Sequence, residues 1–385
     1  MEQALSGVRV LDFGHYIAGP YAAMLLAEQG AEVIKVERPG GDPFRKELGF
    51  IVWNRSKRGI TLDLKQAEGQ RIAQELARRA DILIENYHPG IADKLGIGYD
   101  TLRQLNPQLV YCSISGFGHS GPYRDLPGWD PIVASVASVY VSQAEPKPPL
   151  YLVLPLPSYY AAFMSVFSMA TALLARGLMG KGQHIDMSLF NSILGAQSGR
   201  IVDFEGVKRL PFGDPQGGMP LYRLYQGRDG KWFFLALGNL TFFAKFAVAM
   251  GHEEWLTEPR FQGAPFLILP PTSTQLIAMF KEIFSTRTRD EWLEFLRAAD
   301  LPCAPALSVA EFMNDPQVLA NGMVEVVEQP PLGKVREMGI AVRFPLTPGR
   351  IKGPAPALGQ HTEEVLADLG YSAREMARLK GQGVI

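Results

Sequence analysis

Short apolar segments alternate with amphipathic ones along the first 120 residues. The apolar segments are typical of strands, and the amphipathic segments of helices. We expect strands at residues 8–13, 31–37, 82–85 and 109–113, and helices at about 20–29 and 66–79. Pro20 suits a first helical position, where its missing N–H needs no helical partner. Strands that alternate with helices predict a parallel α/β sheet.

One apolar segment is long enough to span a bilayer, because residues 150–175 contain no charged side chain. Pro155 and Pro157 interrupt its first third, and Ser158 follows directly. We therefore interpret the segment as a buried core helix behind a loop, which continues to about residue 178. Residues 180–183 (GKGQ) end it, and residues 184–189 are expected to form a strand or the entry to a helix.

The pattern changes after residues 211–222, which are rich in glycine and proline. Residues 222–226 and 232–237 flank an Arg-Asp-Gly turn and predict a hairpin. Amphipathic helices are expected near 240–250, 274–284 and 290–299, then proline-rich extended chain from about 325 and a last helix at 362–369. We predict a large domain at 1–210, a small domain at 211–325, and a C-terminal segment at 326–385 that returns to the large domain.

The chain has 385 residues, of which 47% are hydrophobic and 20% charged, with a formal net charge of -1. This balance gives no support to a nucleic-acid or membrane-surface role. Cys112 and Cys303 lie far apart, so no disulfide framework and no metal site is expected. The N-terminal residues lack a basic segment followed by an apolar one, and cytoplasmic residence is expected.

Gly14 and Gly19 flank the first strand–helix turn, but their spacing differs from GxGxxG. A dinucleotide site is therefore a weak prediction. The simpler interpretation is that Gly19 permits a tight turn.

Several strings, in order from residue 5 to the last helix, resemble the family III (CaiB/BaiF-type) CoA-transferases. They are LSGVRVLDF, AGPYAAMLLAEQGAEVIKVERPGGDPFR, NRSKRGITLDL, ADILIENYHPGIADKLGIGYD, GKGQHIDMSL, LPCAP and LGQHTEEVL. The resemblance implies a Rossmann-like large domain, built from the N-terminal half and the C-terminal segment, with a smaller inserted α+β domain. It also implies a dimer in which the two chains interlock.

The substrate that the resemblance implies is coenzyme A or an acyl-CoA, with no metal. Its phosphates need fixed cations and hydrogen-bond donors. The implied CoA contacts are Arg38, Lys57, Asn86, Tyr87 and Lys94, with Arg55 and Arg58 in the same NRSKR cluster. On the charge pattern alone, that cluster reads instead as a solvated turn. Gly217 and Gly218, in residues 213–219, resemble the mobile loop that covers the family's site, although a plain linker fits as well.

Transfer in the family uses an aspartate nucleophile, which forms first a mixed anhydride and then an enzyme–CoA thioester. The matching position here is Ser158, and no Asp or Glu lies between residues 147 and 176. A neutral serine hydroxyl needs a base to become a nucleophile. Of the six histidines, His15 in the first strand–helix turn is the candidate. The alternative is that Ser158 is a small loop residue with no chemical role.

The family's racemases pair that same aspartate with a histidine, and Trp129 stands at the histidine position here. A racemase of the usual kind is therefore not expected. Asp130, in a Gly-Trp-Asp-Pro turn, is interpreted as structural because such aspartates commonly bond their own backbone.

Three functions follow from this pattern. The first is a CoA-transferase polypeptide, chemically silent itself, that works in a heterodimer with an Asp-bearing homologue. The second is a homodimeric acyl-CoA enzyme with altered chemistry, such as a dehydratase, lyase or isomerase. The third is a non-catalytic CoA-binding protein. The first is the favoured function, with the other two as alternatives, and no nucleic-acid or membrane partner is expected.

Overall fold

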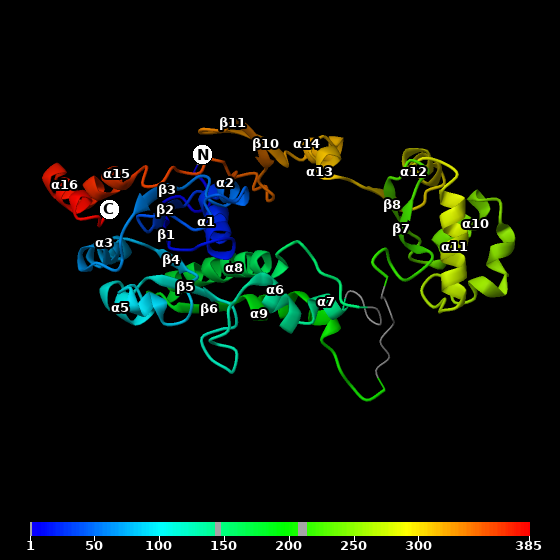
Figure 1. Ribbon diagram of the computed structural model, residues 1–385, viewed down its shortest axis with the longest axis horizontal. Helices are drawn as coiled ribbons and strands as arrows, with labels where there is room; N and C mark the ends of the chain where they lie inside the picture. Colours follow the sequence, from blue (N-terminus) through cyan, green and yellow to red (C-terminus); the bar gives the residue numbers. More distant parts are fainter. Residues whose placement is uncertain (1, 143–147, 207–213) are drawn as a thin grey trace. The chain divides into compact units, whose positions relative to one another are not determined.

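The computed structural model describes residues 2–142, 148–206 and 214–385 (Figure 1). Its contacts divide the chain into two compact units. The first comprises residues 1–137, 153–202 and 319–385, and the second comprises 138–152 and 203–318. The small domain predicted at 211–325 overlaps the second unit, which also includes the short stretch 138–152.

The first unit contains a six-stranded sheet in the order β3-β2-β1-β4-β5-β6, and every neighbouring pair is parallel. The predicted parallel sheet is thus confirmed. Its strands are β1 (Arg9–Asp12), β2 (Glu32–Glu37), β3 (Arg58–Thr61), β4 (Ile82–Glu85), β5 (Val110–Ser115) and β6 (His184–Ser188). Its helices up to residue 200 are α1 (Ala18–Glu28), α2 (Gly49–Trp53), α3 (Ala67–Arg78), α4 (Ile91–Lys94), α5 (Tyr99–Leu105), α6 (Asp130–Val136), α8 (Leu156–Met179), α9 (Leu189–Ala196) and the 3-10 turn η1 (Ser198–Arg200).

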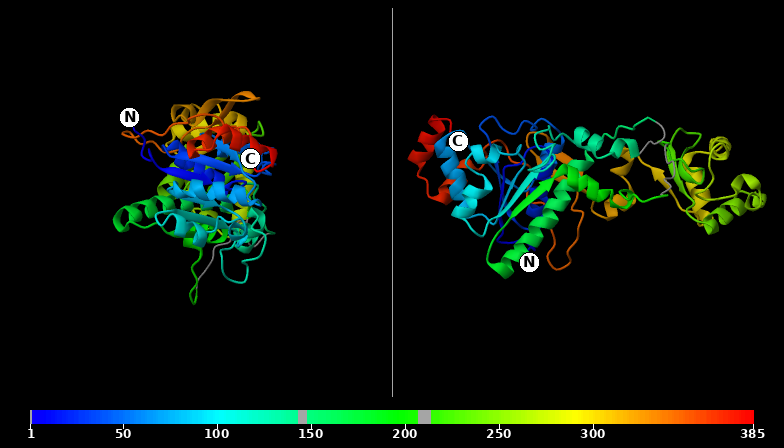
Figure 2. Two further views of the ribbon diagram at one scale, coloured as in Figure 1. Left: turned by 90° about the vertical axis from the view of Figure 1, so that its left-hand side faces the viewer. Right: turned by 90° about the horizontal axis from the view of Figure 1, so that it is seen from below.

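Helices cover both faces of this sheet (Figures 1 and 2). Side chains alternate between the faces, as the pleat requires. Leu11, Leu83 and Tyr111 point to one face and join a buried core with α3 and α5. On the other face, Cys112 of β5 is fully buried, and α8 packs against β5. The loops that follow the strands are therefore held between two packed layers.

The C-terminal segment returns to the first unit through a hairpin, β10 (Val324–Gln329) and β11 (Gly333–Met338), and two helices, α15 (Thr362–Leu369) and α16 (Ala373–Gly381). His361 donates its N–H to the Gly59 carbonyl of β3, and Tyr371 donates its hydroxyl to Glu75 of α3 at 2.9 Å. Figure 2 shows α15 and α16 beside α3. The last helix predicted at 362–369 is confirmed, whereas the hairpin and α16 were not predicted.

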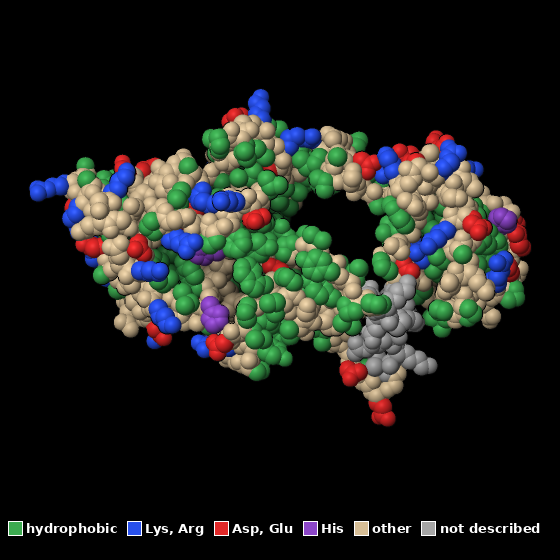
Figure 3. Space-filling view, in the orientation of Figure 1, with side chains coloured by type: hydrophobic (Ala, Val, Ile, Leu, Met, Phe, Trp, Pro, Cys, Tyr) green, Lys and Arg blue, Asp and Glu red, His purple; other side chains and the backbone are tan. Residues whose placement is uncertain are grey.

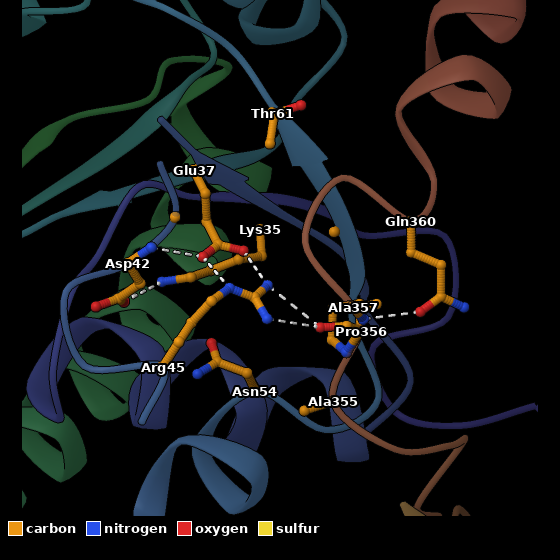
Figure 4. A network of polar contacts seen from close by, with 12 residues as sticks. Lys35, Glu37, Asp42, Arg45, Asn54, Thr61, Ala355, Pro356, Ala357 and Gln360 are labelled. Carbon is orange, nitrogen blue, oxygen red and sulfur yellow. Dashed lines mark hydrogen bonds and ion pairs between the residues drawn. The ribbon is translucent and has the colours of Figure 1, made fainter. Parts of the chain in front are cut away.

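A polar network fixes the same segment against β2 (Figure 4). Glu37 accepts the Asp42 N–H at 2.8 Å and the Arg45 guanidinium at 2.8 and 2.5 Å. The guanidinium also donates to the Pro356 carbonyl at 3.2 Å. Because Pro356 lies more than 300 positions after Arg45, this contact links the two ends of the chain.

The predicted core helix is only half buried. One face of the 24-residue α8 packs inward through Ala161, Ser165 and Met169. Its other face is exposed, including Phe167 at 67% and Leu178 at 83%. By length and composition α8 is long and apolar enough to cross a membrane, but it packs against β5, β6, α1 and α9. An amphipathic pattern was hidden because both faces of this helix are apolar.

The second unit has a three-stranded antiparallel sheet, in the order β7-β8-β9, and several helices. Its elements are β7 (Tyr222–Gln226), β8 (Trp232–Ala236), β9 (Cys303–Ala306), α7 (Val139–Ser142), α10 (Leu240–Ala249), η2 (Glu253–Leu256), η3 (Pro259–Phe261), α11 (Thr272–Phe284), α12 (Arg289–Ala298) and α13 (Val309–Phe312), and α14 (Pro316–Ala320) spans the boundary. The predicted hairpin and helices are confirmed. Aromatic side chains such as Phe246, Phe280 and Phe284 form its core.

Candidate active site

A cavity of about 280 Å³ opens at the carboxyl ends of the strands in the first unit. The strand order reverses between β1 and β4, and such a switch point is where open α/β sheets bind ligands. The loops after β1, β4 and β5 all reach the cavity. Its lining is His15, Tyr16, Ala18, Phe44, Asn86, Tyr87, His88, Pro89, Ile114, Ser115, Gly116, Arg124, Leu126, Gly128, Trp129, Asp130, Ser158 and Leu189.

The loop after β1 is held rigidly by buried polar contacts. Asp12 accepts the Gly14 N–H at 2.8 Å, and the Lys35 ammonium donates to the Gly14 carbonyl. The Asn86 side chain accepts the His15 N–H at 2.7 Å and donates to the His15 carbonyl at 2.9 Å. Both polar groups of Asn86 are thus used on one residue, which fixes the His15 backbone between β1 and β4.

The His15 ring lies against Tyr87, with ring centroids 5.3 Å apart. Burial lowers the pKa of His15, and the nearby Lys35 ammonium lowers it further. The imidazole is therefore neutral at physiological pH. Burial also raises the pKa of Tyr87, so its phenol stays protonated.

Two glycines bring the segment before α6 against the end of β5. A Cβ added at Gly116 would lie 2.3 Å from the Gly128 Cα, closer than real contacts allow. Only glycine at both positions permits this approach. It places Trp129, 53% exposed, and the buried Asp130 at the cavity.

Asp130 and Ser158 form the polar centre of the cavity. The Ser158 hydroxyl donates to Asp130 Oδ2 at 2.7 Å, and the Ser158 N–H donates to Asp130 Oδ1 at 2.8 Å. Ser158 is 2% exposed and Asp130 6%. Burial raises the pKa of Asp130, against the lowering effect of these two hydrogen bonds. The pair joins the first turn of α6 to the first turn of α8.

This geometry changes the interpretation of Ser158. The predicted partner was His15, which lines the same cavity. A hydroxyl has a single hydrogen to donate, and that of Ser158 goes to Asp130. In this structure the Ser158 hydroxyl therefore pairs with Asp130 rather than with the candidate His15. Asp130, expected to bond its own turn, accepts a hydrogen bond from Ser158, which lies 28 positions away.

Two of the predicted CoA contacts are interior side chains with protein partners. Lys57 donates to Asp12 at 2.7 Å, to the Pro20 carbonyl at 2.8 Å and to Asn54 at 3.0 Å, which uses all three ammonium hydrogens. Arg55, fully buried, binds Glu28 and Glu337. In this conformation neither side chain faces the cavity.

Arg58 is less buried but is also occupied by protein groups. Its guanidinium pairs with Glu32 at 2.8 Å, Glu364 at 2.8 Å and Asp368 at 2.9 Å. The NRSKR cluster is thus neither a solvated turn nor a group of free cations. The Arg58 charge connects β2, β3 and α15.

The remaining predicted contacts are divided between cavity and surface. Asn86 and Tyr87 line the cavity. Arg38 is exposed and donates to the Gly41 carbonyl at 3.0 Å, and Lys94 is exposed at the end of α4. Gly217 and Gly218 belong to the second unit, and residue 213 of their loop lies outside the described residues. Among the described residues, no group of three or more His, Cys, Asp or Glu is arranged to hold a metal ion.

Comparisons with known proteins agree along almost the whole chain. A family model described as CoA-transferase family III matches residues 5–362. A succinyl-CoA–D-citramalate CoA-transferase of Chloroflexus aurantiacus is 32% identical over 395 residues, covering 99% of this chain and 98% of the relative. The beta subunit of a succinyl-CoA–L-malate CoA-transferase from the same organism is 32% identical over 405 residues, covering 99% and 98%. The crystal structure of a CaiB/BaiF family protein from Brucella suis superposes with a TM-score of 0.84 at 30% identity, covering 96% of this chain and 100% of that one.

Proposed function

The chain belongs to CoA-transferase family III, and on that premise we propose that it is one polypeptide of a heteromeric CoA-transferase. Its substrates would be acyl-CoA thioesters and carboxylic acids, and an Asp-bearing homologue would supply the nucleophile. The observation that carries this proposal is the hydroxyl of Ser158 at the position expected for that aspartate, bonded to Asp130.

A serine cannot replace the aspartate in this reaction, for a chemical reason. Transfer needs an enzyme carboxyl group that carries the acyl group as an anhydride and then carries CoA as a thioester. A hydroxyl can accept an acyl group, but it has no carbonyl carbon to which the CoA sulfur can bond. Ser158 is therefore silent in CoA transfer, whatever base lies beside it.

For CoA binding, the supporting geometry favours part of the predicted set. We propose that Asn86 and Tyr87 contact CoA from the cavity wall, and that the exposed Arg38 and Lys94 bind its phosphates. Arg55, Lys57 and Arg58 would contact CoA only after losing their carboxylate partners. The loop of Gly217 and Gly218 is retained as a substrate-loop candidate.

We also propose a dimer, either of two such chains or with the homologue. Its support is the apolar surface of the first unit, where hydrophobic side chains gather around α6 and α8 (Figure 3). Phe163, Phe167 and Leu174 are 50%, 67% and 70% exposed. A soluble monomer rarely shows so much contiguous apolar surface. An open groove of about 960 Å³ along residues 321–354 adds a second unfilled surface. The relative that is named as a beta subunit agrees with a two-polypeptide enzyme.

The test is CoA exchange by the purified chain, with succinyl-CoA and acetyl-CoA as donors and a panel of carboxylic acids. We expect no exchange by the wild type, exchange by Ser158→Asp, and none by Ser158→Asn, which has the same shape without a carboxylate. Addition of an Asp-bearing homologue should restore exchange with the wild type. Exchange by the wild-type chain alone at the rate of Ser158→Asp would refute the proposal.

One observation favours the second candidate, a homodimeric acyl-CoA enzyme with altered chemistry. The cavity still contains a carboxylate, that of Asp130. Formation of a new acyl-CoA product by the chain alone, without any acceptor acid, would support that candidate. CoA binding without any turnover would support the non-catalytic one.

A further inference from the structure

The Ser158–Asp130 pair has no role in the transfer reaction, yet it has the form of an activated nucleophile. A serine hydroxyl becomes nucleophilic when a base lies within hydrogen-bond reach, about 2.6–3.2 Å. Here the hydroxyl is 2.7 Å from the Asp130 carboxylate, and both residues line the cavity. We propose that Ser158 and Asp130 are a nucleophile–base pair that hydrolyses acyl-CoA thioesters through an acyl-Ser158 ester. This activity goes beyond the transferase role.

The carboxylate is oriented as a base should be. Its second oxygen accepts the Ser158 backbone N–H at 2.8 Å, so the group cannot rotate away from the hydroxyl. Asp130 is the one carboxylate among the residues that line the cavity. Burial raises the pKa of Asp130, which makes it a stronger base than an exposed aspartate.

The surroundings also favour the negative charge that develops during the reaction. Ser158 lies in the first turn of the 24-residue α8. The amino end of a helix carries a partial positive charge, which stabilises an anion nearby. A thioester carbonyl attacked by Ser158 would develop its oxyanion in this field.

Three aromatic side chains on the cavity wall favour an apolar acyl group. Tyr16, Phe44 and Trp129 all line it, with ring centroids 4.6 Å apart for Tyr16–Phe44 and 6.1 Å for Phe44–Trp129. Tyr16 has a φ of 61°, a region that costs a bulky residue free energy. Aromatic walls bind apolar groups through burial of their surface. The pair should therefore act on acyl-CoA thioesters whose acyl group is apolar rather than charged.

The two half-reactions balance with no group other than water. In the first, Asp130 takes the hydroxyl proton, Ser158 Oγ bonds to the thioester carbonyl carbon, and the carbon–sulfur bond breaks. The leaving thiolate takes the proton from Asp130 and departs as CoA. In the second, Asp130 takes a proton from water, the hydroxide attacks the ester, and Ser158 leaves with that proton as the carboxylic acid is released.

The experiment uses the full-length chain with benzoyl-CoA, acetyl-CoA or succinyl-CoA and no acceptor acid. Free CoA is measured with a thiol reagent, and acid-quenched protein is analysed by mass spectrometry. We expect CoA release with benzoyl-CoA at least about tenfold faster than with succinyl-CoA, and a benzoyl adduct on the peptide that contains Ser158. Ser158→Ala should abolish the adduct, and Asp130→Asn should slow release by about 100-fold or more, the usual contribution of a general base. Ser165→Ala, which removes another buried hydroxyl of α8, should leave release unchanged.

A further variant keeps the test decisive if Asp130→Asn does not fold. Ser158→Cys should form a thioester adduct, which neutral hydroxylamine cleaves far faster than the serine ester. Hydrolysis in ¹⁸O-water should label the released acid and not Asp130. CoA release no faster than in buffer, an adduct that survives Ser158→Ala, or ¹⁸O in Asp130 would each overturn the proposal. Since this assay has neither acceptor acid nor homologue, its failure is distinct from a failure of the transferase proposal.

Discussion

Arg55 offers the sharpest test of how the charges of this chain are used. It follows α2, and its buried guanidinium binds Glu28 at the end of α1 at 2.5 Å and Glu337 in β11 at 3.0 Å. It also donates to the Met338 carbonyl at 2.5 Å. The prediction concerns Arg55→Met, which keeps most of the side-chain volume and removes the charge.

The expected loss of unfolding free energy follows from what remains. Arg55→Met leaves two carboxylates, Glu28 and Glu337, buried without a counter-ion. Removal of one partner from a buried ion pair typically costs about 3–5 kcal/mol. For a unit of this size, that loss corresponds to a melting temperature lower by about 6–20 °C.

Denaturant unfolding of the full chain measures this loss, and calorimetric titration measures CoA affinity below the melting temperature. Arg38→Met is the matched control, since Arg38 is exposed and donates to the Gly41 carbonyl of its own turn. It should change stability by less than about 0.5 kcal/mol and weaken CoA binding. Arg55→Met combined with Glu28→Gln and Glu337→Gln should recover part of the stability, because no unpaired charge then remains.

The pH dependence gives an independent check. Burial raises the pKa of Glu28 and of Glu337 above the ordinary 4.5, and the Arg55 guanidinium opposes that rise. Without Arg55 both pKa values rise further, so both carboxyls are protonated at a higher pH. The cost of Arg55→Met should therefore be largest near pH 8 and shrink toward pH 5. A loss below 1 kcal/mol, or a loss that grows as the pH falls, would refute this reasoning.

Three further predictions concern other charged or closely packed groups. Lys57→Met should cost about 3–5 kcal/mol in denaturant unfolding, because Asp12 loses its ammonium partner in the interior. Glu311→Gln should leave the stability of the second unit unchanged near pH 2 and lower that stability above pH 4.5, as measured by unfolding at a series of pH values. The Ser308 N–H and two cations hold the pKa of Glu311 at about 2, so its stabilisation is lost as the pH falls to that value. Gly128→Ala should cost about 1–3 kcal/mol and impair CoA release, since its Cβ would lie 2.5 Å from Gly116.

Neighbouring positions provide the controls for these variants. Lys94→Met removes an exposed lysine and should change stability by less than about 0.5 kcal/mol. Gly177→Ala adds a Cβ in open space within α8 and should be neutral or slightly stabilising. If Lys94→Met lowered stability as much as Lys57→Met, burial of the lysine would not be the cause of the loss. If Gly177→Ala lowered stability as much as Gly128→Ala, close approach of the backbone would not be the cause.

The spacing of apolar residues along the chain was enough to predict the parallel sheet and the hairpin of the small antiparallel sheet. The missed elements had weaker signals. The hairpin β10–β11 alternates charged and apolar residues around two prolines, and the prolines suggested extended chain. The helix α16 begins with a capping box, in which the Ser372 side chain accepts the Glu375 N–H and the Glu375 side chain accepts the Ser372 N–H. That signal was present in the sequence, and it was outweighed by the short length and polar character of the segment.

The sequence could not predict which charges are buried. In NRSKR, Arg55 and Lys57 are interior while Arg58 is half-exposed, although all three belong to one polar run. Their partners lie far away along the chain, and Glu337 is 282 positions from Arg55. Local composition carries no information about such partners. Periodicity fails as well, because residues 54–57 lie between α2 and β3 and only Arg58 belongs to a strand.

The Ser158–Asp130 pair at the centre of the cavity likewise joins residues that are far apart in the sequence. Serine rather than aspartate at position 158 also changes the charge next to Asp130. An aspartate at position 158 would place a second carboxylate about 3 Å from Asp130, where two charges cannot both be stable. One of the two would then be protonated. With Ser158, the partner is a neutral hydroxyl donor, whose hydrogen bond lowers the pKa of Asp130 against the rise that burial causes. Serine at position 158 therefore removes the nucleophile for CoA transfer and leaves Asp130 as the base for ester formation. Ser158→Asp should consequently move the cavity toward exchange and away from hydrolysis, whereas Asp130→Asn should support neither reaction.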